Sequence, residues 1–264
     1  MRMRFIQVDA FADRAFTGNP AAVMPLDAWP DDATMQAIAA ENNLAETAFF
    51  VPTDGDADYE LRWFTPEVEV ALCGHATLAS GHVVLTDDPS RASVRFRTRQ
   101  RGVLEVRRAE DGYELDLPAL PPSPSDDRRS ANALGVMPVT TLFREGGYFV
   151  TVLESEAELR ALSPDFRTLG AAVPGDPSHI VTAPGEHVDF VSRMFAPNAG
   201  IDEDSVTGSA HAVLTPYWAE RLGRDTLTAF QASKRGGHLT CRFAGDRVIL
   251  GGRCVTVIEG EFRL

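Results

Sequence analysis

A thiol and an imidazole flank a glycine in Cys73-Gly74-His75, just before an apolar stretch that predicts a helix. The dipole and free N–H groups of a helix N-terminus lower the pKa of a thiol, so Cys73 could act as a carbon-acid base or a nucleophile. His75 could donate to a bound oxyanion or share a proton with it. Two plainer interpretations stay open: a buried, inert cysteine and a turn histidine bonded to the backbone.

A second reactive pattern lies in Asp204 to Ser209, where Thr207-Gly208-Ser209 enters another apolar stretch. Two hydroxyls and the unpaired N–H groups of a helix start offer a cradle for an anion or an oxyanion. Asp204 could orient His75 or bind a substrate ammonium. The alternative is an ordinary helix N-cap formed by one of the hydroxyls.

Glu46 is a single carboxylate among apolar neighbours, at the expected junction of a helix and a strand. Desolvation would raise its pKa toward the range that is useful for proton transfer near neutral pH. A glutamate that only bonds a turn is the alternative.

Several other chemistries do not match the sequence. No G-x-G-x-x-G follows a strand, no H-E-x-x-H is present, and the six histidines are scattered, so we expect neither a dinucleotide nor a metal site. Thr207-Gly208-Ser209 is not the G-x-S-x-G elbow of an esterase. Cys73 and His75 could also suggest the Cys–His pair of a protease. Two residues apart in sequence, however, their side chains would point away from each other on either a strand or a helix.

The two reactive segments follow the same phrase. Arg62 to Pro66 precedes the first and Arg193 to Pro197 the second, and each copy predicts a strand, a proline-stopped turn, a glycine step and a helix. This separation is much longer than a solenoid repeat, so we predict two related half-domains. If the halves face each other, the two helix starts could meet across one cleft.

We predict an α+β fold in which each half-domain is a curved mixed β-sheet wrapped around a central helix, the halves being related by a pseudo-twofold axis. The proline-rich segment after residue 117 separates residues 1–118 from 119–264, and the last strand is free to return to the first half. A helix is expected from Pro30-Asp31-Asp32 to Asn42-Asn43. Strands are expected at 5–11, 47–51, 94–97, 103–106, 113–117, 248–250 and 255–258.

Composition narrows the function classes. The net charge of −13 argues against nucleic-acid binding, and no apolar run reaches the roughly 20 residues of a membrane helix. The first nine residues turn acidic too soon for a signal peptide, so a cytoplasmic protein is expected. The three cysteines are an odd number and lack the spacing of a metal site, so we do not expect a disulfide framework.

Together these motifs resemble the phenazine-biosynthesis PhzF-like isomerase family, which is similar in fold to diaminopimelate epimerase. The likeness covers nearly the whole chain and rests on these segments: Asp9 to Phe11, Phe16 to Val23, Asn43 to Thr47, Arg62 to Thr77, Asp204 to Ala210 and Gln231 to Gly237.

The resemblance implies an active site between the halves, with catalytic residues Glu46, His75, Asp204 and Ser209. It implies substrate contacts by Asn19, Cys73, Gly74, Thr207 and Gly208. It further implies no cofactor, no metal, a small anionic substrate, and the homodimer that the family often forms.

One departure decides the expected mechanism. The related epimerases use two cysteines, one from each repeated phrase. In this chain we assign the position of the second cysteine to Ser205, whose hydroxyl is too weak an acid for a mechanism that needs two thiols. The leading hypothesis is therefore a cofactor-independent isomerase in which Glu46 moves a proton next to a carboxylate or carbonyl. The alternatives are a Cys73-based epimerase or racemase, and a non-enzymatic binding module on the same fold.

Overall fold

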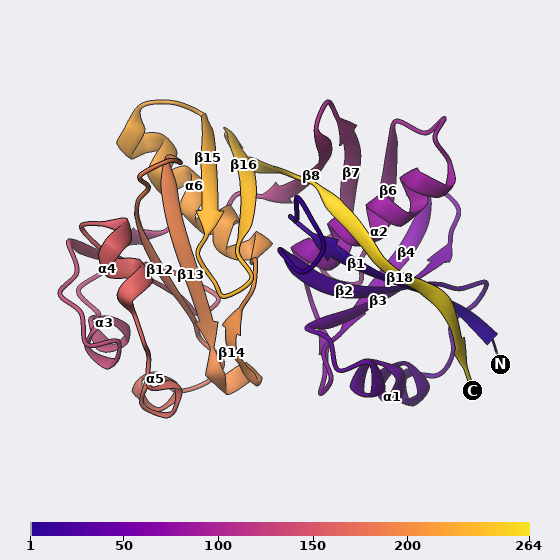
Figure 1. The fold of residues 1–264 in the computed structure, drawn as a ribbon, viewed down its shortest axis with the longest axis horizontal. Helices are drawn as coiled ribbons and strands as arrows, with labels where there is room; N and C mark the ends of the chain where they lie inside the picture. Colours follow the sequence, from indigo (N-terminus) through magenta and orange to yellow (C-terminus); the bar gives the residue numbers. More distant parts are fainter. Residues whose placement is uncertain (1) are drawn as a thin grey trace. The chain divides into compact units, whose positions relative to one another are not determined.

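The computed structural model describes residues 2–264 and divides the chain into two compact units. Unit 1 contains the residues up to Leu117 together with Leu250–Leu264, and unit 2 is Pro118–Ile249. The expected second half-domain ran to residue 264. In the structure the final strand, β18 (Cys254–Arg263), pairs along β1 (Arg2–Ala10) and so belongs to unit 1 (Figure 1).

Unit 1 is a mixed sheet around one helix. β1 lies between β18 and β2, β2 is parallel to β3, and β3 is antiparallel to β4. β4 then pairs with short β5 and, in parallel, with β6, after which β7 and β8 follow as antiparallel neighbours. The bounds are β2 Asn19–Pro25, β3 Glu46–Pro52, β4 Tyr59–Phe64, β5 Glu69–Val70, β6 Ser93–Arg97, β7 Val103–Ala109 and β8 Gly112–Pro118.

Helix α2 (Gly74–Asp87) is the central helix of unit 1, buried along most of its length. Gly81 lets it approach the sheet closely, because a Cβ there would come within 2.4 Å of Val106 on β7. Helix α1 (Asp32–Asn42) packs Met35 and Ile38 into a separate apolar cluster. The side chain of Asp31 caps α1, and the helix ends at Asn42–Asn43 as the sequence predicts, with Asn43 in the left-handed conformation.

Unit 2 follows the same plan. β9 and β11 flank β10, β11 is parallel to β12, and β12 is antiparallel to β13. β13 pairs with short β14 and, in parallel, with β15, which pairs with β16. The bounds are β9 Ser123–Pro124, β10 Thr140–Arg144, β11 Tyr148–Val152, β12 Ser178–Pro184, β13 Phe190–Ala196, β14 Ile201–Asp204, β15 Thr226–Gln231, β16 Gly237–Ala244 and β17 Arg247–Gly252.

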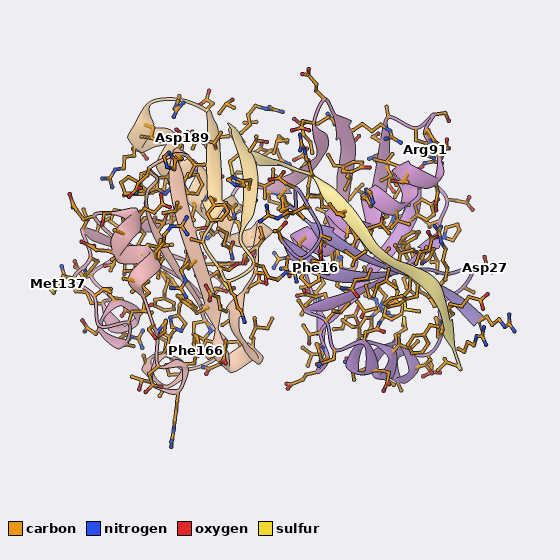
Figure 2. The ribbon with its side chains drawn as sticks, in the orientation of Figure 1. Phe16, Asp27, Arg91, Met137, Phe166 and Asp189 are labelled. Carbon is orange, nitrogen blue, oxygen red and sulfur yellow. The ribbon has the colours of Figure 1, made fainter. Side chains whose placement is uncertain are left out.

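Helix α6 (Gly208–Leu222) is the buried central helix of unit 2. Three shorter helices, α3 (Arg129–Ala133), α4 (Glu156–Ala161) and α5 (Phe166–Ala172), precede β12 or lie beside its cluster of apolar side chains. A few large apolar side chains remain at the surface, among them Met137, which is 84% exposed (Figure 2). Within residues 2–264, no helix combines the length and the apolar character that crossing a membrane requires.

The two units therefore repeat one series of elements. From β1 to β7 and from β10 to β16, successive pairings are antiparallel, parallel, antiparallel, antiparallel, parallel and antiparallel. The predicted α+β fold with a sheet and a central helix in each half is confirmed. The repeated phrase occupies equivalent places, β4 to the start of α2 and β13 to the start of α6.

Candidate active site

Glu46 is the first residue of β3, where it pairs with Ala21 of the parallel strand β2. Its side chain is 12% exposed, so the carboxylate is largely removed from water. The preceding αL residue Asn43 ends α1 and turns the chain directly into the strand. Glu46 is thus held by the backbone of the sheet.

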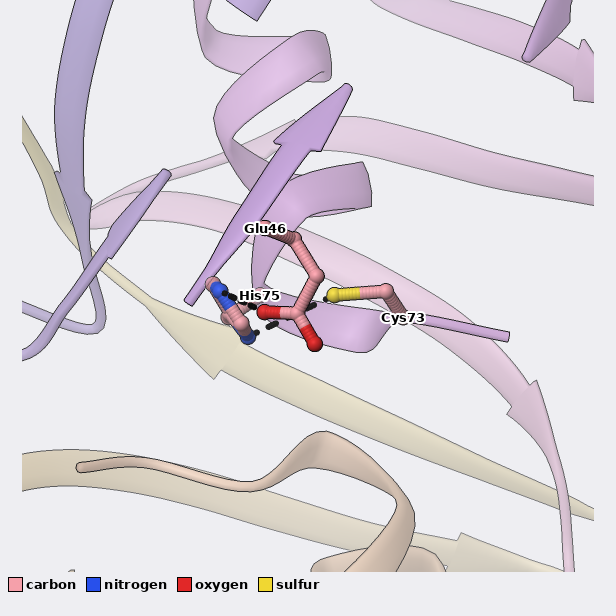
Figure 3. A group of neighbouring side chains, drawn as sticks. All are labelled: Glu46, Cys73 and His75. Carbon is pink, nitrogen blue, oxygen red and sulfur yellow. Dashed lines mark hydrogen bonds and ion pairs between the residues drawn. The ribbon is translucent and has the colours of Figure 1, made fainter. Parts of the chain in front are cut away.

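Cys73 and His75 reach this carboxylate from the start of α2. Cys73 is the N-cap in an extended conformation, with φ −140° and ψ 109°, and its side chain makes no capping bond. His75 Nε2 lies 3.0 Å from Glu46 Oε2, and Cys73 Sγ lies 3.5 Å from His75 Nδ1 (Figure 3). The expectation that Cys73 and His75 point away from each other is wrong, because the residue before the first helical turn is extended.

Neither polar atom of the Glu46–His75 pair has an aligned hydrogen bond. Although Oε2 and Nε2 are only 3.0 Å apart, the contact is off the N–H direction, and both atoms are buried. It is therefore a close ion-pair contact and not a linear hydrogen bond. A small shift of either side chain would align it.

Asn19, at the start of β2, completes this group. Its Nδ2 lies 3.1 Å from His75 Nδ1, and the residue is fully buried. In the neutral form of His75, an amide N–H donated to Nδ1 places the ring proton on Nε2, toward Glu46, whereas the charged ring donates from both nitrogens. In the structure Asn19 therefore orients the imidazole, in addition to the substrate contact that the resemblance implies.

Burial and neighbouring charges shift the pKa values of both Cys73 and His75. Burial, reinforced by the charge of Glu46, raises the pKa of the Cys73 thiol to about 11. Burial alone lowers the pKa of His75, but Cys73 and Glu46 outweigh it and raise this pKa well above its ordinary value. The expectation that the helix start lowers the pKa of Cys73 is wrong, because desolvation outweighs the helix dipole.

In unit 2 the predicted residues gather at the start of α6. Thr207 is the N-cap, yet its hydroxyl makes no capping bond and donates instead to Asp204 Oδ2 at 2.5 Å. Gly208 and Ser209 form the first turn; Gly208 is buried and Ser209 half-buried. Capping by the Thr207 side chain, the plainer interpretation, is therefore wrong.

Gln231 holds this loop, and our sequence reasoning assigned it no role of its own. Its Oε1 accepts from the Thr207 backbone N–H at 2.8 Å, and its Nε2 donates to the Asp204 carbonyl at 2.8 Å. The side chain is fully buried at the end of β15. A polar residue at an inward position of an alternating strand was the available signal.

Comparison of the N-termini of α2 and α6 shows which residue of unit 2 is equivalent to Cys73. Cys73 and Thr207 are both N-caps, with ψ 109° and 106°, and each precedes a glycine that begins the helix. Each N-cap carbonyl accepts from the side chain four residues on, Thr77 in one unit and His211 in the other. Thr207, not Ser205, therefore occupies the position equivalent to Cys73.

Unit 1 also contains a cavity of about 740 Å³ whose lining includes Arg4, Tyr59, Val84 and Asp87. It lies by the last turn of α2, whereas Cys73 and His75 are at the first turn. None of the predicted site residues lines it. The predicted site residues of unit 1 therefore lie at the opposite end of α2 from this cavity.

Comparison with known proteins identifies the family. Residues 8–260 match the model of the PhzC-PhzF family, described as phenazine biosynthesis-like protein. The chain belongs to this family. An uncharacterized isomerase of Pseudomonas aeruginosa is 48% identical over the whole of both chains. A crystal structure of a PhzF-family protein from Enterococcus faecalis superposes with a TM-score of 0.92 at 44% identity, again over both whole chains.

The fold extends beyond the family. A hydroxyproline epimerase from Agrobacterium vitis has a TM-score of 0.63 at 12% identity, covering 98% of this chain and 92% of that one. The predicted resemblance and the epimerase-like fold are confirmed, as is the enzyme class, an isomerase. The individual roles of Glu46, His75, Asp204 and Ser209 stay predictions.

Proposed function

We propose that this protein is a cofactor-independent isomerase that moves a proton next to a carboxylate or carbonyl group of a small anionic metabolite. The observation that carries the proposal is the buried Glu46 carboxylate, whose Oε2 lies 3.0 Å from His75 Nε2. A desolvated carboxylate beside a proton donor can accept a proton and return it without a metal or an organic cofactor.

In this mechanism Glu46 takes the proton from a carbon next to the carbonyl. The C–H electron pair moves toward the carbonyl oxygen, giving an enolate-like species, and Glu46 returns the proton to a different carbon. His75 offers its Nε2–H to Glu46 or to the developing negative charge. The backbone N–H groups near Gly74 add the positive end of the α2 dipole.

We assign Asp204, Thr207, Gly208 and Ser209 of unit 2 to binding and polarising the substrate. The Gln231 bonds keep the Asp204 carbonyl and the Thr207 N–H in one arrangement, which supports a preorganised binding loop. The half-buried Ser209 presents a hydroxyl on the first turn of α6.

A single carboxylate base fits better than a pair of thiols. Cys73 has a pKa of about 11 and stays protonated near neutral pH, and threonine at the equivalent position is a far weaker acid still. An epimerase in which Cys73 is the base is the second candidate. Its support is the 3.5 Å contact of Cys73 Sγ with His75 Nδ1, which could remove the thiol proton during catalysis.

Deuterium exchange tests the proposal without a guess at the product. The purified protein is incubated with a pool of acidic metabolites in heavy water, and mass spectrometry records enzyme-dependent deuterium incorporation. We expect incorporation into one or a few carboxylates or carbonyl compounds. Incorporation that persists at the wild-type rate in Glu46→Gln would overturn the assignment of the base.

Cys73→Ser separates the two candidates. If Glu46 is the base, this variant keeps most of the exchange activity, because the thiol then takes no part in the proton transfer. If Cys73 is the base, exchange falls to the level of a blank. Alkylation of the thiol is a poorer test, since a bulky adduct also blocks the site sterically.

A further inference from the structure

We propose that Glu46, Cys73 and His75 form a binding site for a thiolate-preferring divalent cation, represented by Zn²⁺, which inhibits the enzyme by occupying its base. The inhibition rests on the proposed function, whereas the binding does not. Neither the family description nor the names of the relatives assigns a metal to this chain.

The three residues have the ligand composition of a zinc site, and one pair of their atoms has its spacing. A thiolate, an imidazole and a carboxylate are the three ligand types that zinc takes in proteins. One donor atom from each residue lies within 4.8 Å of the other two. With Zn–S about 2.3 Å and Zn–N about 2.0 Å, sulfur and nitrogen on two corners of a tetrahedron are about 3.5 Å apart. The Cys73 Sγ to His75 Nδ1 distance is 3.5 Å.

Burial keeps competing water away from the three ligand side chains. The three residues are only 9%, 5% and 3% exposed, in the order Glu46, Cys73 and His75. Glu46 Oε2 is buried without an aligned hydrogen bond and lies 3.0 Å from His75 Nε2, so the carboxylate must turn from Nε2 toward the Nδ1 side to reach the cation. Three protein ligands also leave a fourth position for water, as in zinc sites with an open coordination position.

Binding changes a few bonds and no oxidation state. The Cys73 S–H bond breaks, the proton leaves to solvent, and a metal–sulfur bond forms. His75 ligates through Nδ1, and Asn19 Nδ2 gives up its contact with that nitrogen. Glu46 supplies an oxygen lone pair to the cation, and the carboxylate can then no longer accept a proton from substrate.

The chain provides its own control. Cys241 is another fully buried thiol, on β16 of unit 2. In the part of the chain that the structure describes, Glu46, Cys73 and His75 form the one group of three such ligands. Cys241→Ala thus removes a thiol of similar burial without touching the proposed site.

The test is a titration of the chelator-treated full-length protein with Co²⁺, followed by displacement with Zn²⁺. We expect one equivalent of Co²⁺ to produce a thiolate charge-transfer band in the near ultraviolet and tetrahedral bands in the visible, and Zn²⁺ to abolish both. Cys241→Ala should give the same spectra. Cys73→Ser should lose the charge-transfer band and bind Zn²⁺ at least about tenfold more weakly.

Glu46→Gln provides a second variant if Cys73→Ser does not fold, and it should weaken Zn²⁺ binding while keeping the charge-transfer band. The proposal is overturned if wild type shows no such band with micromolar Co²⁺, or if the band survives in Cys73→Ser. Mg²⁺ should neither bind nor compete, since it prefers oxygen ligands. Spectra that fail while metal-free deuterium exchange proceeds reject the metal site alone; spectra that succeed without exchange reject the isomerase alone.

Discussion

The two units place different chemical groups on equivalent elements. β3 and β12 begin at Glu46 and at Ser178, and each pairs in parallel with the strand before it. The helix starts likewise replace Cys73 and His75 of unit 1 by Thr207 and Ser209 of unit 2. Unit 1 thus carries a carboxylate, a thiol and an imidazole at positions where unit 2 carries hydroxyls.

The supporting frame, by contrast, is the same in both units. Arg62 binds Glu69 through two nitrogens and lies 5.0 Å from the Phe64 ring. Arg193 does the same with Glu203 and lies 4.9 Å from Phe195. The repeated phrase therefore places the N-terminus of the central helix in each unit. The side chains at that N-terminus differ between the units.

The largest expected effect tests the difference between Glu46 and Ser178. Glu46→Gln should lower the rate of deuterium exchange about 10²- to 10⁴-fold, because it removes the proposed base and keeps its shape. The thermal midpoint should fall modestly, because the buried ion pair with His75 is lost. Ser178→Ala, the matched change in unit 2, should leave exchange near the wild-type rate, and a loss as large as that of Glu46→Gln would break the comparison.

The central helices differ in the way their histidines titrate. Burial lowers the pKa of His211 on α6 to about 4, so the folded protein favours the neutral ring. Stability from this group is complete above the unfolded pKa near 6.5 and is lost as the pH falls toward 4, by about 3 kcal/mol in total. The free energy of unfolding, measured with urea between pH 7 and 4, should depend less steeply on pH in His211→Gln than in wild type.

His75 on α2 should show the opposite sign. Its folded pKa is raised well above the ordinary value, so its contribution is complete below the unfolded pKa and is lost as the pH rises through the folded one. The stability difference between wild type and His75→Gln should accordingly shrink with increasing pH above neutrality. A difference that grows would contradict the ion pair with Glu46.

The shared frame can be tested with one substitution in each unit. Arg62→Ala and Arg193→Ala should each destabilise the protein by about 2–3 kcal/mol, since each removes a guanidinium that pairs with a partly buried carboxylate. Glu69 keeps Arg99 as a second partner, which places Arg62→Ala at the lower end of this range. Arg193 also donates to the carbonyls of Leu159 and Leu162, so its loss should cost slightly more. Chemical denaturation measures both, and a change below about 0.5 kcal/mol in either would reject an equal role.

The smallest effect concerns backbone strain. Among residues 2–264, the non-glycine residues with positive φ are Phe11, Phe16 and Asn43, all in unit 1. Phe16 has φ 73°, and its ring is 76% exposed. Phe16→Gly should therefore raise the free energy of unfolding by up to about 1 kcal/mol, since glycine adopts this conformation without strain. Phe11→Gly, which removes a buried ring, should instead destabilise.

Much of this organisation was predictable from local sequence. The doubled phrase, the α1 caps and the alternating strands after Val94 are local patterns, and the structure follows them. The Cys73–His75 contact was not predictable, because it depends on the extended N-cap residue. The raised pKa of Cys73 was missed for a related reason: burial among distant segments, which no local pattern reports, outweighs the helix dipole.

The position equivalent to Cys73 was misassigned because the two copies differ in length between the proline and the glycine. Seven residues separate Pro66 from Gly74, whereas ten separate Pro197 from Gly208. Aligning the glycines, as the helix starts require, selects Thr207. The role of Gln231 needed the fold itself, since it bonds a loop 24 residues away in sequence.

The return of β18 to β1 fixes an order of events during synthesis. All residues of unit 2 leave the ribosome before Leu250–Leu264, so unit 2 can finish folding while β1 still lacks its outer neighbour. Nascent unit 1 would then hold its central helix, α2, against a sheet in which β1 is an open edge. Such an edge invites intermolecular pairing, so ribosome stalling in the last strand should promote aggregation through unit 1.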